Sequence, residues 1–389
     1  MLEDKHRNPV LASLSVLMVF ALYGLPFLQI APNRLVPGQP LYFFSIIPGP
    51  TWLLLAVLVA TTVTAMFKPR AAWLWSALAI AAAGMPSLLW LAAIQASLGL
   101  QGQLPIARAS LGSAFWLALT LLGFIVSSAL QQLRVTKLQV AAICAALLLA
   151  LGGLLVSGAC DDLSLIKEYA NRTDDFVQTM TRHVQIVLLA LACTLIIGLP
   201  LGWVAHAHAK AGRALLPVLN IIQTIPSIAL FGLLMAPLAL LAASVPALSR
   251  AGISGVGLAP AVIALTLYGL LPVVRGTLVG LQQVPSTLVQ AARALGLTRF
   301  QTLAHVELPL ALPVLLGGVR TAAVSSVGLA AVTALIGAGG LGSILFEGLF
   351  ANAQDVVLLG VLPIIALGVV VDVLFKGLLS LARRRVKPW

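Results

Sequence analysis

The chain has 389 residues, of which 60% are hydrophobic and 9% are charged, and its mean hydropathy is +1.07. Soluble domains carry about 25% charged residues, so this composition excludes a water-soluble globular protein and indicates a polytopic membrane protein. The formal net charge of +12 comes from short basic clusters between apolar stretches. That distribution favours cytoplasmic loops and lipid headgroups over a nucleic-acid partner.

A helix that crosses the bilayer needs about 20 apolar residues, and the sequence predicts ten such spans. They are expected near residues 10–31, 51–67, 71–97, 110–130, 138–157, 184–205, 215–241, 258–280, 310–335 and 356–380. The fold class expected from this pattern is an all-α polytopic membrane protein with about ten transmembrane helices.

Basic residues mark one side of this predicted topology. They are Lys5, Arg7, Lys68, Arg70, Arg134, Lys137, Lys210, Arg213, Arg275, Arg293, Arg299, and the terminal group Arg383, Arg384, Arg385 and Lys387. With ten spans, all of these residues fall on the same side. Because basic residues concentrate in cytoplasmic loops, both termini are expected in the cytoplasm.

The longest polar segment outside the region 285–309 is 160–183, which is expected to face the other side. It divides the chain into two predicted domains. Residues 1–160 form an amino-terminal accessory membrane region of about five helices, and residues 161–389 form a second membrane domain of about five helices. We find no internal repeat between the halves, so an inverted-repeat transporter is not indicated.

The sequence has no recognisable motif for catalysis or metal binding. Cys144, Cys160 and Cys193 have no paired spacing, which argues against a disulfide framework or a metal site. His206 and His208 are two residues apart and would not share a helix face. We therefore expect no catalytic residues and no metal.

Residues 285–309 are patterned as a cytoplasmic helical hairpin. Pro285 suits a first helical turn, and Leu288, Ala291, Ala292 and Leu295 recur at helical spacing. Gly296 is placed to end the first helix in a left-handed conformation. Thr298 and Gln301 form a capping box for a second helix, on which Phe300, Leu303 and Ala304 share a face and after which Pro309 follows. Such a hairpin is either a plain connector or an element that docks into a partner's groove.

Small residues recur every fourth position towards the end of the chain. They are Gly318, Ala322, Ser326, Ala330, Ala334, Ala338 and Gly342. A row of this kind lets helices approach closely, so we expect it on one helix face. Residues 337–342 also satisfy the pattern GxGxxG, but a dinucleotide site requires a strand before it and a βαβ unit, which two membrane spans do not provide.

Charged residues inside the last spans are expected near the membrane surface. Arg275 and Arg320 are interpreted as anchors at the cytoplasmic ends of their spans, where long side chains reach the headgroups. Asp372 and Lys376, four residues apart, are expected to pair with each other.

The hairpin resembles the "EAA" loop of the permeases of ATP-binding-cassette (ABC) importers. The matching pattern is Ala291-Ala292, then Gly296, and nine residues later Val306-x-Leu308-Pro309. In that family the loop binds the ATPase subunit and transmits its motion. The resemblance therefore implies an ATPase-coupling role for Gln290, Ala291, Ala292, Gly296, Thr298, Phe300, Leu308 and Pro309. Gln290 stands where many members have glutamate, which puts an ion pair at this point in doubt.

Four further segments narrow the resemblance: QTIPSIALFGLL (223–234), YGLLPVVRGT (268–277), ELPLALPVLLGGVRTA (307–322) and ALIGAGGLG (334–342). They look like the permeases of osmoprotectant importers, which carry glycine betaine, choline, carnitine or related compounds. The resemblance covers about 184–380 and implies a type I (MetI-like) permease core. It further implies a translocation pathway near Gln223, Thr224, Pro226, Ser227, Tyr268, Pro272 and Ser326.

The resemblance also implies partners and a location. A cytoplasmic ATPase subunit would bind ATP, so no cofactor is expected in this chain, and an external binding protein would deliver the substrate. A second permease, identical or homologous, and membrane lipid are expected around it in a bacterial inner membrane. An ABC permease for an amino acid or a sulfonate remains an alternative within the class. An ion-coupled secondary transporter is an alternative from another class. Such carriers bury ionisable groups in the middle of the membrane, whereas the charges of this chain cluster at the ends of the predicted spans, which counts against this alternative.

Overall fold

The structure is a computed structural model that describes residues 9–33, 36, 38–46, 50–67, 71–250 and 252–385. The basic residues Lys5, Arg7, Lys68, Arg70 and Lys387, and the side chains of Arg384 and Arg385, lie outside the described parts. The chain divides into two compact units, Met1–Asn171 and Arg172–Trp389, and each unit is described by itself.

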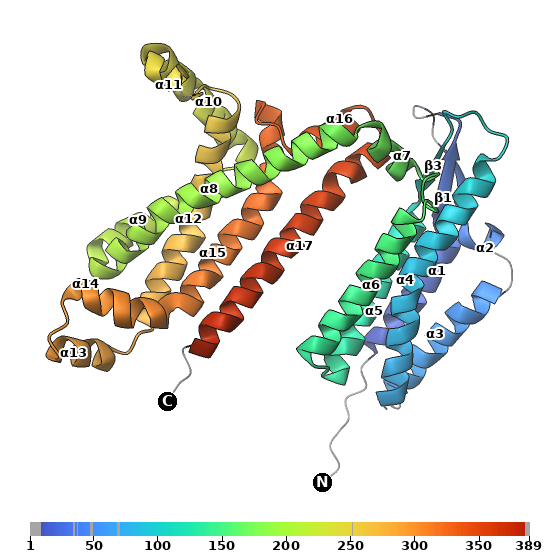
Figure 1. The fold of residues 1–389 in the computed structure, drawn as a ribbon, viewed down its shortest axis with the longest axis horizontal. Coiled ribbons are helices and arrows are strands. Elements are labelled where there is room, and N and C mark those ends of the chain that lie inside the picture. The colour runs from blue at the N-terminus through green and yellow to red at the C-terminus, as the bar shows by residue number, and fades with distance from the viewer. Residues whose placement is uncertain are drawn as a thin grey trace, which may run out of the picture. The chain divides into compact units, whose positions relative to one another are not determined.

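The first unit combines helices with a small sheet (Figure 1). Its helices are α1 (Val10–Gly24), α2 (Phe43–Ile46), α3 (Pro50–Phe67), α4 (Ala71–Leu100), α5 (Ser113–Leu133), α6 (Lys137–Val156) and α7 (Ser164–Asn171). Three strands, β1 (Pro26–Ala31), β2 (Gln39–Tyr42) and β3 (Arg108–Leu111), form an antiparallel sheet in the order β2-β1-β3.

The expected span 10–31 is wrong in its second half, because the chain leaves the helix at Leu25 and continues as strand β1. Pro26 has no N–H to continue a helical ladder, and a residue before proline favours an extended backbone. The strand is instead stabilised by pairing on both sides, with β2 and β3. Phe27 and Leu28 are fully buried, so the apolar run that suggested a span fills the core.

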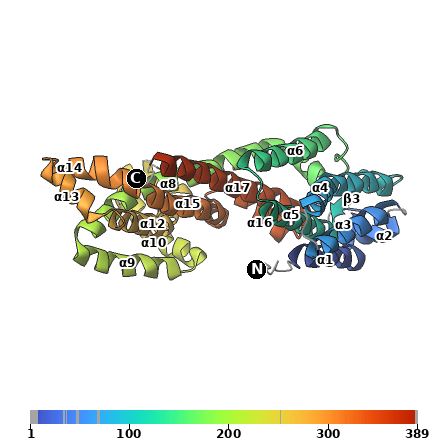
Figure 2. The same ribbon diagram turned by 90° about the horizontal axis from the view of Figure 1, so that it is seen from below.

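The second unit is built around α12 (Leu258–Gln282), which packs between α8 (Thr173–Ala207) and α15 (Leu308–Ala330) (Figures 1 and 2). Its other α-helices are α9 (Ala209–Thr224), α10 (Ser227–Ser244), α11 (Pro246–Arg250), α13 (Ser286–Ala294), α14 (Arg299–Thr302), α16 (Leu341–Phe350) and α17 (Gln354–Arg385). A π-helical turn (Leu303–Glu307) joins α14 to α15, and a 3₁₀ helix (Val332–Ile336) follows α15.

Among the described residues, eight helices are long and apolar enough to cross a membrane. They correspond to eight of the ten expected spans, and the segments expected at 10–31 and 51–67 contain shorter apolar helices. The all-α membrane architecture is thus confirmed, with a small sheet in addition.

The expected span 215–241 is not continuous. It is divided into α9 and α10 at Ile225, whose backbone is extended. The physical cause is Pro226, which disfavours the helical conformation at the residue before it. Proline at this place therefore separates two helices, whereas the sequence predicted one continuous span.

The expected row of small residues is correct only as far as Ala330, where α15 ends. Gly318, Ala322, Ser326 and Ala330 lie on α15, but Ala334 is in the 3₁₀ helix, Ala338 is in the following turn and Gly342 is in α16. Glycines 337, 339 and 340 have positive φ angles, which reverse the chain before α16. A four-residue period alone could not detect this reversal.

Gly318 sets the distance between α12 and α15. A β-carbon at Gly318 would overlap the carbonyl oxygen of Pro272 and lie 3.1 Å from the α-carbon of Gly276. The two backbones therefore touch, as small residues at membrane helix crossings permit. Beside this contact Ala322 and Ser326 are also buried.

Candidate functional site

The hairpin α13–α14 is held by local hydrogen bonds at its turn. The N–H of Leu297 donates to the carbonyl of Ala292 at 3.2 Å, and the N–H of Gly296 donates to the carbonyl of Arg293 at 3.0 Å. These two bonds form a Schellman motif, and Gly296 has the left-handed φ of +89° that this motif requires. The predicted stop of the first helix is confirmed.

The second helix begins with the predicted capping box. The N–H of Gln301 donates to the hydroxyl of Thr298 at 3.3 Å, and the N–H of Thr298 donates to the side-chain oxygen of Gln301 at 2.9 Å. Both donors would otherwise lack a partner within the helix. Because the cap lies between the two arms, it determines the angle at which the hairpin leaves its turn.

The second arm is not a separate short helix, because it continues through a π-helical turn into α15. The N–H of Leu308 donates to the carbonyl of Leu303, five residues earlier. Pro309 has no N–H to bond to His305, and widening the preceding turn accommodates that missing bond. The hairpin's second arm and α15 therefore form one continuous helical backbone.

The hairpin presents an apolar tip. Leu295 is 81% exposed and Phe300 is 77% exposed, whereas Ala292 is 6% exposed and Thr302 is fully buried. The other residues assigned to coupling, Gln290, Ala291, Gly296, Thr298, Leu308 and Pro309, are exposed. Two large apolar side chains of the capped turn thus do not contribute to the core of the unit.

The substitution Thr298→Ala tests the cap. We expect it to destabilise α14 by about 1 kcal/mol, because Ala cannot accept the hydrogen bond from Gln301. Amide hydrogen exchange of residues 299–302 in the detergent-solubilised protein should accelerate about fivefold. Thr298→Ser keeps the hydroxyl and serves as the matched control. Equal exchange in both variants would contradict the role of the cap.

The predicted pathway residues lie around the break between α9 and α10. The side-chain amide of Gln223 donates to the carbonyl of Tyr268 at 2.8 Å, and the Tyr268 hydroxyl donates to the carbonyl of Ile225. The first bond satisfies the carbonyl that Pro272, four residues later in α12, leaves without a helical donor. The second satisfies a carbonyl at the break before Pro226, as interrupted membrane helices require. The hydroxyl of Thr224 donates to the carbonyl of Ile221.

The remaining pathway candidates differ in exposure. Gln223, Thr224 and Pro226 are exposed, while Ser227, Tyr268 and Pro272 are partly buried. Ser326 is 2% exposed and faces the interior of the unit. The exposed hydroxyls of α15 belong instead to Thr321 and Ser325, which sequence reasoning did not single out.

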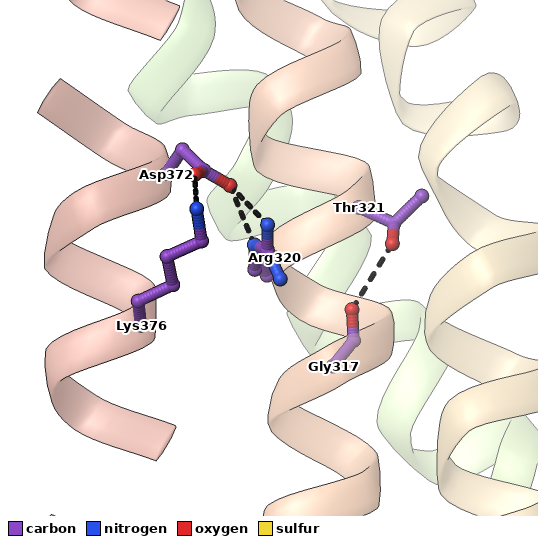
Figure 3. Close-up of polar contacts among 5 residues, drawn as sticks. All are labelled: Gly317, Arg320, Thr321, Asp372 and Lys376. Carbon is purple, nitrogen blue, oxygen red and sulfur yellow. Dashed lines mark hydrogen bonds and ion pairs between the residues drawn. The ribbon is translucent and has the colours of Figure 1, made fainter. Parts of the chain in front are cut away.

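Arg320, expected as an anchor near the cytoplasmic end of its span, also has an ion-pair partner that the sequence analysis did not predict. Its Nε lies 2.6 Å from Oδ1 of Asp372, and Nζ of Lys376 lies 2.7 Å from Oδ2 of the same carboxylate (Figure 3). The expected pair of Asp372 with Lys376 is confirmed, but it is part of a cluster that joins α17 to α15. The sequence could have suggested this pairing, because opposite charges inside two apolar segments are rare and usually pair with each other.

Two family models match the chain. Residues 6–166 match the model described as "ABC transporter permease YehY, N-terminal domain". Residues 195–385 match "Binding-protein-dependent transport system inner membrane component".

Curated relatives are similar to about half of the chain. The osmoprotectant import permease protein OsmW of Salmonella typhimurium is 41% identical over 197 residues, which are 51% of this chain and 86% of the relative. The choline transport system permease protein OpuBB of Bacillus subtilis is 34% identical over 206 residues, 53% of this chain and 86% of the relative. Among solved structures, the inward-facing MetNI methionine ABC transporter matches with a TM-score of 0.46 and 25% identity, over 54% of this chain and 96% of that one.

Proposed function

This chain belongs to the permease subunits of osmoprotectant ABC importers, and we propose that it moves glycine betaine or a related quaternary ammonium compound into the cytoplasm. The observation that carries the proposal is the hairpin, whose capped turn exposes Leu295 and Phe300 beyond the helical bundle. This tip binds the groove of a separate ATPase subunit, which binds and hydrolyses ATP.

The hairpin end of the second unit faces the cytoplasm in this proposal. Figure 1 draws α13, α14 and the carboxyl-terminal end of α17 at the same end of the unit. Arg293, Arg299 and Arg383 lie there, and basic residues concentrate on the cytoplasmic side. Both termini are then cytoplasmic, in a multi-pass protein of a bacterial inner membrane.

The proposed partners are the other subunits of an ABC importer. An external binding protein delivers the substrate at the end of the unit opposite the hairpin, and a second permease, identical or homologous, completes the pathway. ATP closes the ATPase subunits, and the motion reaches α15 through the hairpin and the π-helical turn. The chain itself binds no cofactor.

The test is reconstitution of the chain with its ATPase and binding subunits in proteoliposomes. We expect glycine betaine loaded on the binding protein to stimulate ATP hydrolysis and to accumulate inside, and both effects to require the ATPase subunit. Omission of the ATPase is the control. Uptake that continues without it, driven by a proton or sodium gradient, would identify a secondary transporter instead.

A further inference from the structure

The cluster Arg320–Asp372–Lys376 joins α15 to α17 in the second unit, away from the ends of both helices. Arg320 and Asp372 are several turns from either end of α15 and α17. At the same level Val319 packs in an apolar cluster with Leu195 of α8 and Phe375 of α17. Ionisable groups within apolar membrane helices are costly and commonly mark a substrate or ion pathway.

The cluster has an excess of positive charge. Two cations share the single carboxylate of Asp372, so one positive charge remains uncompensated within the cluster. The side chain of Lys376 is 60% exposed and that of Arg320 is 35% exposed, while Asp372 is 24% exposed. The anion is thus the least exposed member of the cluster, and the cations are the more accessible groups.

The stretch of α15 that carries Arg320 has both apolar and hydroxyl-bearing sides. Residues of α15 that face α8, among them Leu315, Val319 and Ala322, are buried in an apolar cluster. Thr321 and Ser325 are exposed, and Figure 3 shows Thr321 on the same stretch of α15 as Arg320, with Asp372 and Lys376 on the neighbouring helix. Thr321 projects from the side of α15 away from α17 (Figure 3), so the cationic groups gather at the contact between α15 and α17 and the hydroxyls lie on another side of the helix.

We propose that Arg320 and Lys376, held in place by Asp372, bind the carboxylate of a zwitterionic osmoprotectant during translocation. A guanidinium and an ammonium are the side chains that bind carboxylates, and the hydrogen bonds of Asp372 fix their direction. The same positive excess repels a substrate that is only cationic. The chain is therefore selective for carboxylate-bearing compounds such as glycine betaine over choline, an inference that rests on the proposed function.

The experiment compares initial uptake of glycine betaine and choline by the reconstituted complex at saturating binding protein. The betaine-to-choline uptake ratio of each variant is divided by the ratio of the wild type. This division cancels the contribution of the binding protein, which captures each substrate equally in all samples. Lys376→Gln removes the accessible charge and leaves the Arg320–Asp372 pair intact. We expect it to lower the betaine-to-choline uptake ratio about fivefold or more.

Two further variants complete the design. Lys376→Arg restores the charge and should restore the ratio, and Lys210→Gln, at an exposed lysine in the first turn of α9, is the matched control. An unchanged ratio in Lys376→Gln overturns the inference and leaves the cluster as a tie between α15 and α17. The same conclusion holds if choline uptake stays undetectable in that variant while glycine betaine uptake is unchanged. A wild type that transports neither compound would overturn the proposed function instead.

Discussion

Phe300→Asp is expected to lower the affinity of the chain for its ATPase subunit about 30-fold, and with it ATP-driven uptake. Buried aromatic anchors commonly contribute about 2 kcal/mol or more to an interface, which corresponds to about 30-fold in affinity. The substitution would also place a charge in an apolar groove, where it lacks a partner. Co-purification of the ATPase subunit with the tagged permease measures the effect directly.

The chain offers a closely matched control for this variant. Phe350 in α16 is 77% exposed, the same fraction as Phe300, and it lies at the opposite end of the unit from the hairpin (Figure 1). Phe350→Asp should leave the ATPase bound. Because both side chains are exposed in the isolated chain, neither variant should change its thermal stability. ATPase binding that survives Phe300→Asp would show that the hairpin is a connector only.

Gly318→Val is expected to prevent α12 and α15 from packing. The new β-carbon would overlap the backbone oxygen of Pro272, and a backbone group cannot move aside as a flexible side chain can. Overpacking a close-packed contact costs about 1–3 kcal/mol and sometimes more, and this one lies between two of the most extensively packed helices of the unit. Thermal unfolding in detergent should begin several degrees lower, with a reduced yield of monodisperse protein.

Gly317→Val is the control for that prediction. The neighbouring glycine has no heavy atom within 4 Å of a built β-carbon, so the same side chain meets no obstacle one residue earlier. Both substitutions exchange glycine for valine on the same helix, which makes their effects on helix propensity equal. If the two variants unfolded at the same temperature, the close approach of α12 and α15 at Gly318 would be disproved.

The hairpin could be predicted well because its structure depends on neighbours in sequence. The left-handed Gly296 and the reciprocal bonds of Thr298 and Gln301 require only residues within one or two turns. The π-helical turn was not predicted. Pro309 shows only that one backbone hydrogen bond must be absent from the helix, and it does not show how the helix adapts. The backbone resolves that absence by widening the helix rather than by ending it.

The elements that were misjudged depend on partners distant in sequence. Phe27 and Leu28 are equally apolar in a membrane span and in strand β1, and the pairing with β2 and β3 decides between the two. Arg320 and Asp372 are 52 residues apart, so hydropathy placed each one separately near a surface. Their pairing, which joins α15 to α17, depends on how the two helices pack and could not be predicted from either segment alone.

The sequence by itself determined the membrane class, eight of the spans and the capped hairpin, because hydrophobic length and local hydrogen bonding act within short segments. Only the tertiary structure decided which apolar segment became a strand, where α15 ended and which charges met. Those outcomes depend on packing and charge pairing between helices, whose free energies are set by neighbours that a linear pattern does not specify.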